Sequence, residues 1–139
     1  MIEYHYETEF RVENEMKVSD WMKRIIEEEG YVVDKLDYIF CNDERLLSLN
    51  MEYLGHDTYT DIITFDYSKG RNIAGDVFIS IDRVRENALK YKEDFEKEFL
   101  RVACHGILHL MGYKDKTEAE GLEMRKKEEE KINMFHVEQ

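Results

Sequence analysis

The chain has 139 residues, of which 42% are apolar and 37% are charged, a composition typical of a folded globular protein and not of a disordered or fibrous one. Because this length suits one domain with its own core, we expect residues 1–139 to form a single domain. The net charge of −12 argues against a protein whose whole surface binds nucleic acid.

Neither a membrane span nor a signal peptide is expected. The apolar runs are only a few residues long, and the N-terminus lacks the basic and apolar regions of a secretory signal. Cys41 and Cys104 lie far apart in a chain without secretory features, which favours reduced thiols. We therefore expect a cytoplasmic protein with no membrane partner.

The first half of the chain mixes strand and helix patterns. Residues 2–6 alternate apolar and polar side chains, as a half-buried strand does. Apolar residues at helical spacing then predict a helix with Ser19 near its start and Gly30 as its stop. The next expected elements are a strand over 36–41, a helix capped by Asn42 or Asp43 and running to about Tyr53, and strands over 61–66 and 73–81 joined by a turn at 68–72.

The second half of the chain is predicted to be helical. One helix begins near Asp82, a second covers about 94–111, and a third starts with a capping box at Thr117 and ends near Phe135. The second helix becomes apolar on all sides toward its end, which indicates that it enters the core. Together these elements predict an α+β fold with a small mixed four-stranded sheet packed by about five helices.

Two histidines stand in the buried part of the second of these helices. His105 and His109 are four residues apart, so their side chains lie on one helix face about 6 Å apart. Gly112 is placed to end the helix in the left-handed conformation, and Asp115 follows where the chain turns back. Two imidazoles and one carboxylate with an open fourth position suit zinc. We therefore expect these three side chains to bind one divalent ion, most simply Zn²⁺, at the active site of a hydrolase.

The residue after His105 separates this pattern from the zinc proteases. Those enzymes carry glutamate there as the general base, whereas this chain has Gly106. A glycine inside a helix costs about 1 kcal/mol relative to alanine, and the close approach of a strand or of a substrate backbone would explain it. Without that glutamate, a metal-bound water is the expected nucleophile.

The string from His105 to Asp115 resembles the hallmark of the YbeY family of metal-dependent endoribonucleases, H-G-x-L-H-L-x-G-Y followed by a third ligand. That ligand is usually histidine, and here it is Asp115. Residues 49–65 and 75–80 resemble two further motifs, and the likeness covers about residues 35–130. The resemblance implies an α+β fold, a zinc-like ion and cleavage of single-stranded RNA. It also implies a cytoplasmic role in late maturation of the 3′ end of small-subunit ribosomal RNA and in ribosome quality control.

One position departs from the family pattern. The family's arginine after Asn-x-x-Tyr, implied to help handle RNA, is Leu54 in this chain. Residues 69–92 carry six basic side chains against three acidic ones. From this stretch we expect Arg71, Arg83 and Arg85 to bind the RNA substrate. Either one of them takes the place of the missing arginine, or cleavage is weaker or differently directed. As a charge cluster alone, the stretch also fits a solvated helix face.

Three other functions stay open on the sequence. A peptidase-like zinc hydrolase has the same ligand spacing but is disfavoured by Gly106. A non-catalytic ribosome-assembly factor would use the metal structurally, which the open fourth position disfavours. Two histidines and a carboxylate also suit non-haem iron, as in an oxygenase. The leading interpretation is a single-strand-specific endoribonuclease that acts on ribosomal RNA.

Overall fold

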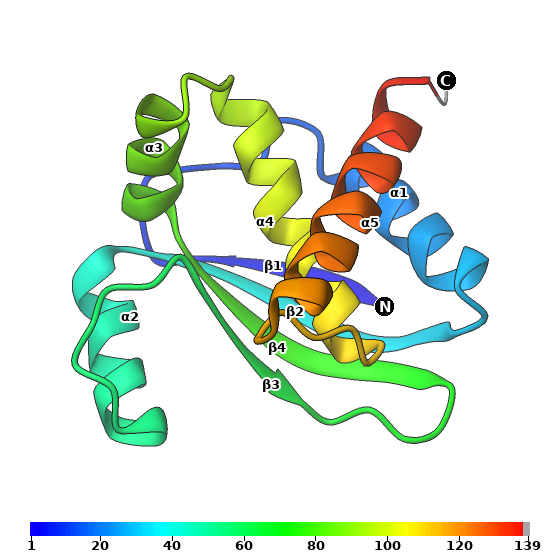
Figure 1. The fold of residues 1–139 in the computed structure, drawn as a ribbon, viewed down its shortest axis with the longest axis horizontal. Coiled ribbons are helices and arrows are strands. Elements are labelled where there is room, and N and C mark those ends of the chain that lie inside the picture. Colours follow the sequence, from blue (N-terminus) through cyan, green and yellow to red (C-terminus); the bar gives the residue numbers. More distant parts are fainter. Residues whose placement is uncertain (138–139) are drawn as a thin grey trace.

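The structure of the chain, a computed structural model that describes residues 1–137, is built on one mixed sheet (Figure 1). The strands lie in the order β1-β2-β4-β3, with β1, β2 and β4 parallel to one another and β3 antiparallel to β4. Their bounds are β1 (Ile2–Tyr6), β2 (Val32–Cys41), β3 (Ile62–Asp66) and β4 (Asn72–Ser80). The expected α+β class with a mixed four-stranded sheet is confirmed.

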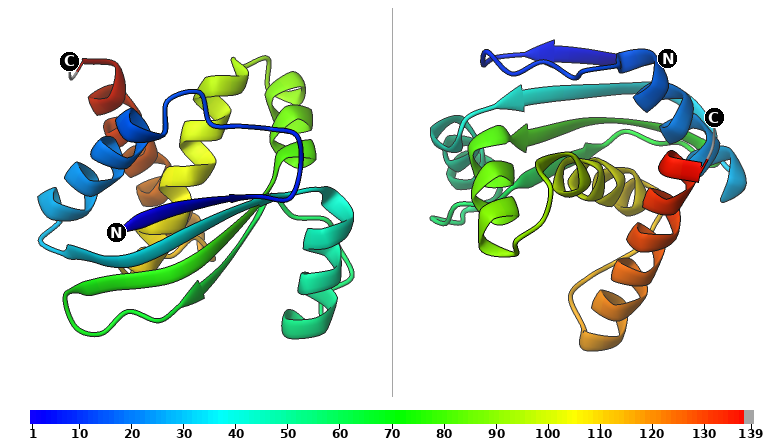
Figure 2. Two further views of the ribbon diagram at one scale, coloured as in Figure 1. Left: turned by 180° about the vertical axis from the view of Figure 1, so that it is seen from behind. Right: turned by 90° about the horizontal axis from the view of Figure 1, so that it is seen from above.

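Helices pack against both faces of this sheet. They are α1 (Glu15–Glu28), α2 (Asp43–Leu49), the short π-helix η1 (Asn50–Leu54), α3 (Ile81–Lys90), α4 (Phe95–Leu110) and α5 (Glu118–Val137). Helix α4 lies across one face with α1 and α5 beside it (Figures 1 and 2). Helix α2 packs on the opposite face, where Leu46 and Leu49 meet Ile63 of β3 in a small second core.

The principal core lies between the sheet and helices α1, α4 and α5. Alternate side chains of the central strands point into it, among them Tyr38 and Phe40 of β2 and Val77 of β4. The buried Tyr38 hydroxyl donates a hydrogen bond of 2.7 Å to the main-chain carbonyl of Ala103 in α4. The buried Trp21 indole likewise joins α1 to α5, and burial of such large aromatic rings supplies much of the stability.

Helix α4 approaches the sheet closely because two glycines leave room. A Cβ atom at Gly106 would lie 3.0 Å from side-chain methyl groups of both Ile62 and Val77. A Cβ atom at Gly75 would lie 2.6 Å from the main-chain oxygen of Phe65 and 3.1 Å from Leu110 of α4. The sequence left two explanations for Gly106, the close approach of a strand or of a substrate backbone. In the structure it is strands β3 and β4 that approach it closely.

The first helix begins earlier than expected. The sequence placed Ser19 near its start, but α1 begins at Glu15, because the Asn14 side chain caps it by accepting a 3.1 Å hydrogen bond from the Lys17 N–H. The Ser19 hydroxyl is instead hydrogen-bonded to that of Tyr4 in β1, at 2.8 Å.

Two further boundaries differ from the prediction. Strand β2 begins at Val32, four residues earlier than expected, because its first residues pair with the start of β4. The helix capped by Asn42 ends at Leu49 and widens into η1 instead of running on to Tyr53. At this change the Asn50 side-chain amide donates to the carbonyl of Thr58 at 2.8 Å, which ties η1 to the following loop. The remaining helices lie within about two residues of the expected positions.

Two expectations about membranes and thiols can be compared with the fold. Within residues 1–137, no helix is both long and apolar enough to cross a membrane. Cys41 and Cys104 are both buried and free, as the sequence led us to expect. Burial raises the pKa of the Cys41 thiol to about 12. Such a thiol stays protonated at neutral pH and behaves as a small apolar side chain.

Alanine substitutions at three glycines test the close approach of α4. Gly75→Ala should destabilise the protein by about 1–3 kcal/mol, because the new methyl group meets a main-chain oxygen that cannot move freely. Gly106→Ala should cost less, because its neighbours are side-chain methyl groups and alanine favours the helix by about 1 kcal/mol. Gly121→Ala in α5 is the control and should stabilise, because nothing lies within 4 Å of its Cβ position. Urea unfolding that ranks Gly75→Ala as the mildest of the three would contradict the packing described.

Candidate metal centre

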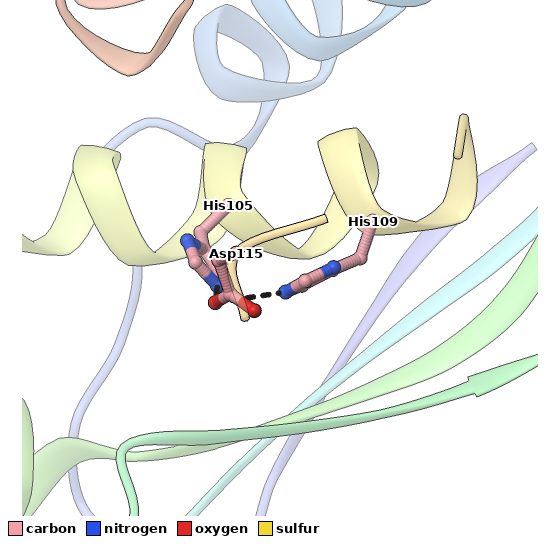
Figure 3. Close-up of side chains that lie close together, drawn as sticks. All are labelled: His105, His109 and Asp115. Carbon is pink, nitrogen blue, oxygen red and sulfur yellow. Dashed lines mark ion pairs between the residues drawn. The ribbon is translucent and has the colours of Figure 1, made fainter. Parts of the chain in front are cut away.

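The three side chains predicted to bind a metal lie together beside β3 (Figure 3). One nitrogen or oxygen atom from each of His105, His109 and Asp115 lies within 4.8 Å of those of the other two. The Asp115 Oδ2 atom is 3.1 Å from Nε2 of His105 and 3.4 Å from Nε2 of His109. The two imidazoles thus turn the same ring nitrogen toward one carboxylate, and this donor set is compatible with a divalent metal.

The end of helix α4 fixes the orientation of His109. Gly112 has φ +99°, and its N–H donates to the His109 carbonyl while the Tyr113 N–H donates to that of Leu108, both at 3.0 Å. This turn brings the Tyr113 carbonyl to 2.9 Å from His109 Nδ1. Because a carbonyl can only accept a hydrogen bond, Nδ1 carries the proton and Nε2 presents a lone pair toward Asp115.

His105 is oriented by a residue that the sequence did not single out. The Glu128 carboxylate of α5, only 5% exposed, accepts a 2.6 Å hydrogen bond from His105 Nδ1. The same carboxylate lies 3.6 Å from the Arg101 guanidinium. Carboxylates that hold the outer nitrogen of a ligating histidine fix the ring and its tautomer. The sequence did indicate that Glu128 is buried, because it lies four residues from both Met124 and Ile132 and so stands on the buried face of its helix.

The surroundings of His105 also act on its charge. Burial lowers the pKa of this imidazole, but the hydrogen bond and charge of Glu128 outweigh burial, and the pKa is raised above 6.5. Asp61, at the start of β3, is a second carboxylate that the sequence did not identify as part of the site. Burial raises the pKa of Asp61, while the charges of His105 and Arg83 act in the opposite direction. Its neighbour Ile62 packs against Gly106, the residue after His105, so Asp61 lies beside the centre.

The three arginines expected to bind RNA lie in different places. Arg83 of α3 forms an ion pair with Asp43 at 2.7 Å, and of the three it is the one whose charge acts on the pKa of Asp61. Arg85, on the same helix, is exposed and stacks on the ring of Phe95. Arg71 donates to a main-chain carbonyl just after α1. The fold therefore does not gather these three guanidinium groups into one patch.

Two other clusters of acidic and histidine side chains can be compared with the cluster of His105, His109 and Asp115. Each of them has a lysine ammonium group within ion-pair distance, which already neutralises part of its charge. In the cluster at His105, by contrast, both outer imidazole nitrogens are bound and both inner ones point at a carboxylate. The other clusters are Glu3, His5 and Asp37 with Lys35, and Glu28, Glu29 and Glu130 with Lys131.

The role of Glu128 can be tested by titrating His105 in the metal-free protein. NMR should give a pKa above 6.5, and Glu128→Gln should lower it, because burial then acts without the compensating carboxylate. Since the folded-state pKa is raised, the pair stabilises the fold below pH 6.5, and this contribution is lost as the pH rises through the raised value. Glu129→Gln is the control. An equal pKa change in both variants would refute the assignment.

Comparison with known proteins agrees with the motif. The family described as "Endoribonuclease YbeY" matches residues 2–136. Proteins of that name from Flavobacterium johnsoniae and Flavobacterium psychrophilum are 52% and 50% identical over 139 residues, which cover all of this chain and 100% and 99% of theirs. A solution structure of a Thermotoga maritima protein has a TM-score of 0.70 and 26% identity, covering 99% of this chain and 91% of that one. As the resemblance implied, the chain belongs to the endoribonuclease YbeY family.

Proposed function

We propose that the protein is a single-strand-specific endoribonuclease whose His105, His109 and Asp115 hold one zinc ion. The observation that carries the proposal is the convergence of two imidazole Nε2 atoms and one carboxylate, with both Nδ1 atoms engaged by other partners. Membership of the endoribonuclease YbeY family supports RNA as the substrate. Three protein ligands also leave the fourth position of a tetrahedral ion open, as hydrolytic sites require.

The residues of the chain prepare this site for phosphodiester hydrolysis. When bound, a zinc-class ion supplies a Lewis acid that lowers the pKa of water toward neutrality. Glu128 and the Tyr113 carbonyl hold the two imidazoles in the tautomer that presents Nε2. Gly106 takes the place where a protease would carry its general base, and its role in packing against β3 and β4 accounts for it. This favours RNA over peptide as the substrate.

We propose that RNA reaches the centre along α3. Leu54, at the family's arginine position, is half exposed in η1 and offers no charge. Arg83 stands in the first turn of α3, where its N–H donates to the Ser80 hydroxyl, and the Ser80 N–H donates to the Asp61 carbonyl at 3.0 Å. Arg83 then contacts a phosphate near the cleaved bond, and the exposed Arg85 and Arg71 contact more distant parts of the strand.

The proposed substrate is ribosomal RNA of the small subunit, cleaved during late 3′-end maturation and quality control in the cytoplasm. The net charge of −12 supports a local contact with RNA over a surface that wraps it. The free thiols of Cys41 and Cys104 suit a reducing compartment.

The first test combines metal analysis with a cleavage assay. The purified protein should hold about one zinc-class ion per chain and cleave single-stranded RNA but not casein. His109→Ala should lose the ion and the cleavage together, whereas His5→Ala on β1 should keep both. Casein cleavage without RNA cleavage would favour the peptidase. Metal binding without either activity would favour the assembly factor.

The second test measures how RNA binding depends on salt, with the protein kept free of metal to prevent cleavage. The affinity for single-stranded RNA should fall as salt rises. Arg83→Gln and Arg85→Gln should each reduce the slope of log affinity against log salt concentration by about 0.7 if one phosphate contact is lost. Lys23→Gln, on α1, is the charge-matched control and should leave the slope unchanged. A slope that all three variants share with the unmodified protein would exclude α3 from the RNA contact.

A further inference from the structure

Glu29, at the end of α1, contacts none of the three proposed ligands but binds side chains next to their supports. Its Oε1 accepts a 2.7 Å hydrogen bond from the Tyr113 hydroxyl. Its Oε2 accepts hydrogen bonds from the ammonium groups of Lys127 and Lys131, at 3.0 and 2.9 Å. The carboxylate is only 14% exposed, so its charge is poorly shared with water.

The first of these bonds leads to His109. Tyr113 uses its main-chain carbonyl to hold His109 Nδ1 and its side chain to bind Glu29. Through this tyrosine, Glu29 restrains the turn that follows α4. The carbonyl that orients the imidazole thus has a fixed position relative to α1.

The other two bonds lead to His105. In the sequence of α5, Lys127 immediately precedes Glu128 and Lys131 follows it by three residues. Lys131 is fully buried. Because both lysines bind the one carboxylate at the end of α1, rotation or sliding of α5 would stretch these ion pairs. Glu128 is thereby held 2.6 Å from His105 Nδ1.

We infer that Glu29 is a positioning residue for the metal centre, fixing the outer partners of both histidines through one carboxylate. The inference rests on the proposed function, because it takes His105 and His109 as ligands. Burial alone would raise the pKa of Glu29, but its bonds to Lys131, Tyr113 and Lys127 outweigh burial and lower the pKa to about 2. The carboxylate therefore stays ionised throughout the neutral range.

The chain offers a matched control for the test. Glu28 also binds Lys131, at 2.6 Å, but no contact between Glu28 and either Tyr113 or Lys127 is found within residues 1–137. We would titrate Glu29→Gln and Glu28→Gln with Co²⁺, whose absorption spectrum reports ligand geometry, after confirming by thermal unfolding in a chelator that both variants fold. Loss of an outer partner of a metal ligand typically costs 10–100-fold in affinity. We expect a loss of about tenfold and an altered spectrum for Glu29→Gln, and less than about a twofold change for Glu28→Gln.

Tyr113→Phe provides a second variant, which keeps the carbonyl that binds His109 but removes the hydroxyl. Its effect on the Co²⁺ dissociation constant should be less than additive with that of Glu29→Gln, because one variant removes the donor of the bond and the other removes the charge of its acceptor. This variant also carries the test if Glu29→Gln does not fold. Equal Co²⁺ affinities and spectra for Glu29→Gln and Glu28→Gln, or no effect of Tyr113→Phe, would overturn the inference even if the unmodified protein cleaves RNA. The expected Co²⁺ results without RNA cleavage would count against the nuclease proposal alone.

Discussion

The distance between α4 and the sheet is the constraint on which the rest of the structure depends. The helix that carries both histidines can lie against β3 and β4 only because Gly106 and Gly75 present no side chains at the contact. The Tyr38 hydroxyl then ties the same helix to β2 from within the core. A tightly packed interior has few alternative arrangements, so the two imidazoles inherit the rigidity of the sheet. The positions of the two imidazoles therefore depend on a helix packed on the sheet and not on a long loop.

The two histidines reach the same orientation by different routes. His109 is held by a carbonyl four residues away, which the local hydrogen bonds of the helix end place there. His105 is held by Glu128, 23 residues away, which depends on the docking of α5. One half of the centre is therefore set by short-range geometry and the other half by tertiary packing. A disturbance far from the centre, at the contact of α1 with α5, acts on the second half first.

How far the sequence predicts this protein follows from the same distinction. The spacing of His105, His109 and Asp115 around Gly112 specifies a local arrangement, and the structure brings these side chains together. The capping box at Thr117 is likewise local and forms as expected. Glu128 was not identified, because its spacing from Met124 and Ile132 indicates a buried face but not that this face meets His105, which depends on the docking of α5. Similarly, the excess of basic residues over 69–92 led us to expect one group of RNA-binding arginines. Arg83 and Arg85 are two residues apart on a helix, so they face different sides and contact different partners.

The position of Glu128 along the chain has a consequence for biosynthesis. Synthesis proceeds from the N-terminus, so a nascent chain contains both histidines before α5 exists. At that stage the chain contains the Tyr113 carbonyl that accepts from His109, but not yet the Glu128 carboxylate that accepts from His105. The centre therefore matures only after α5 has been made and has docked against α1 and α4.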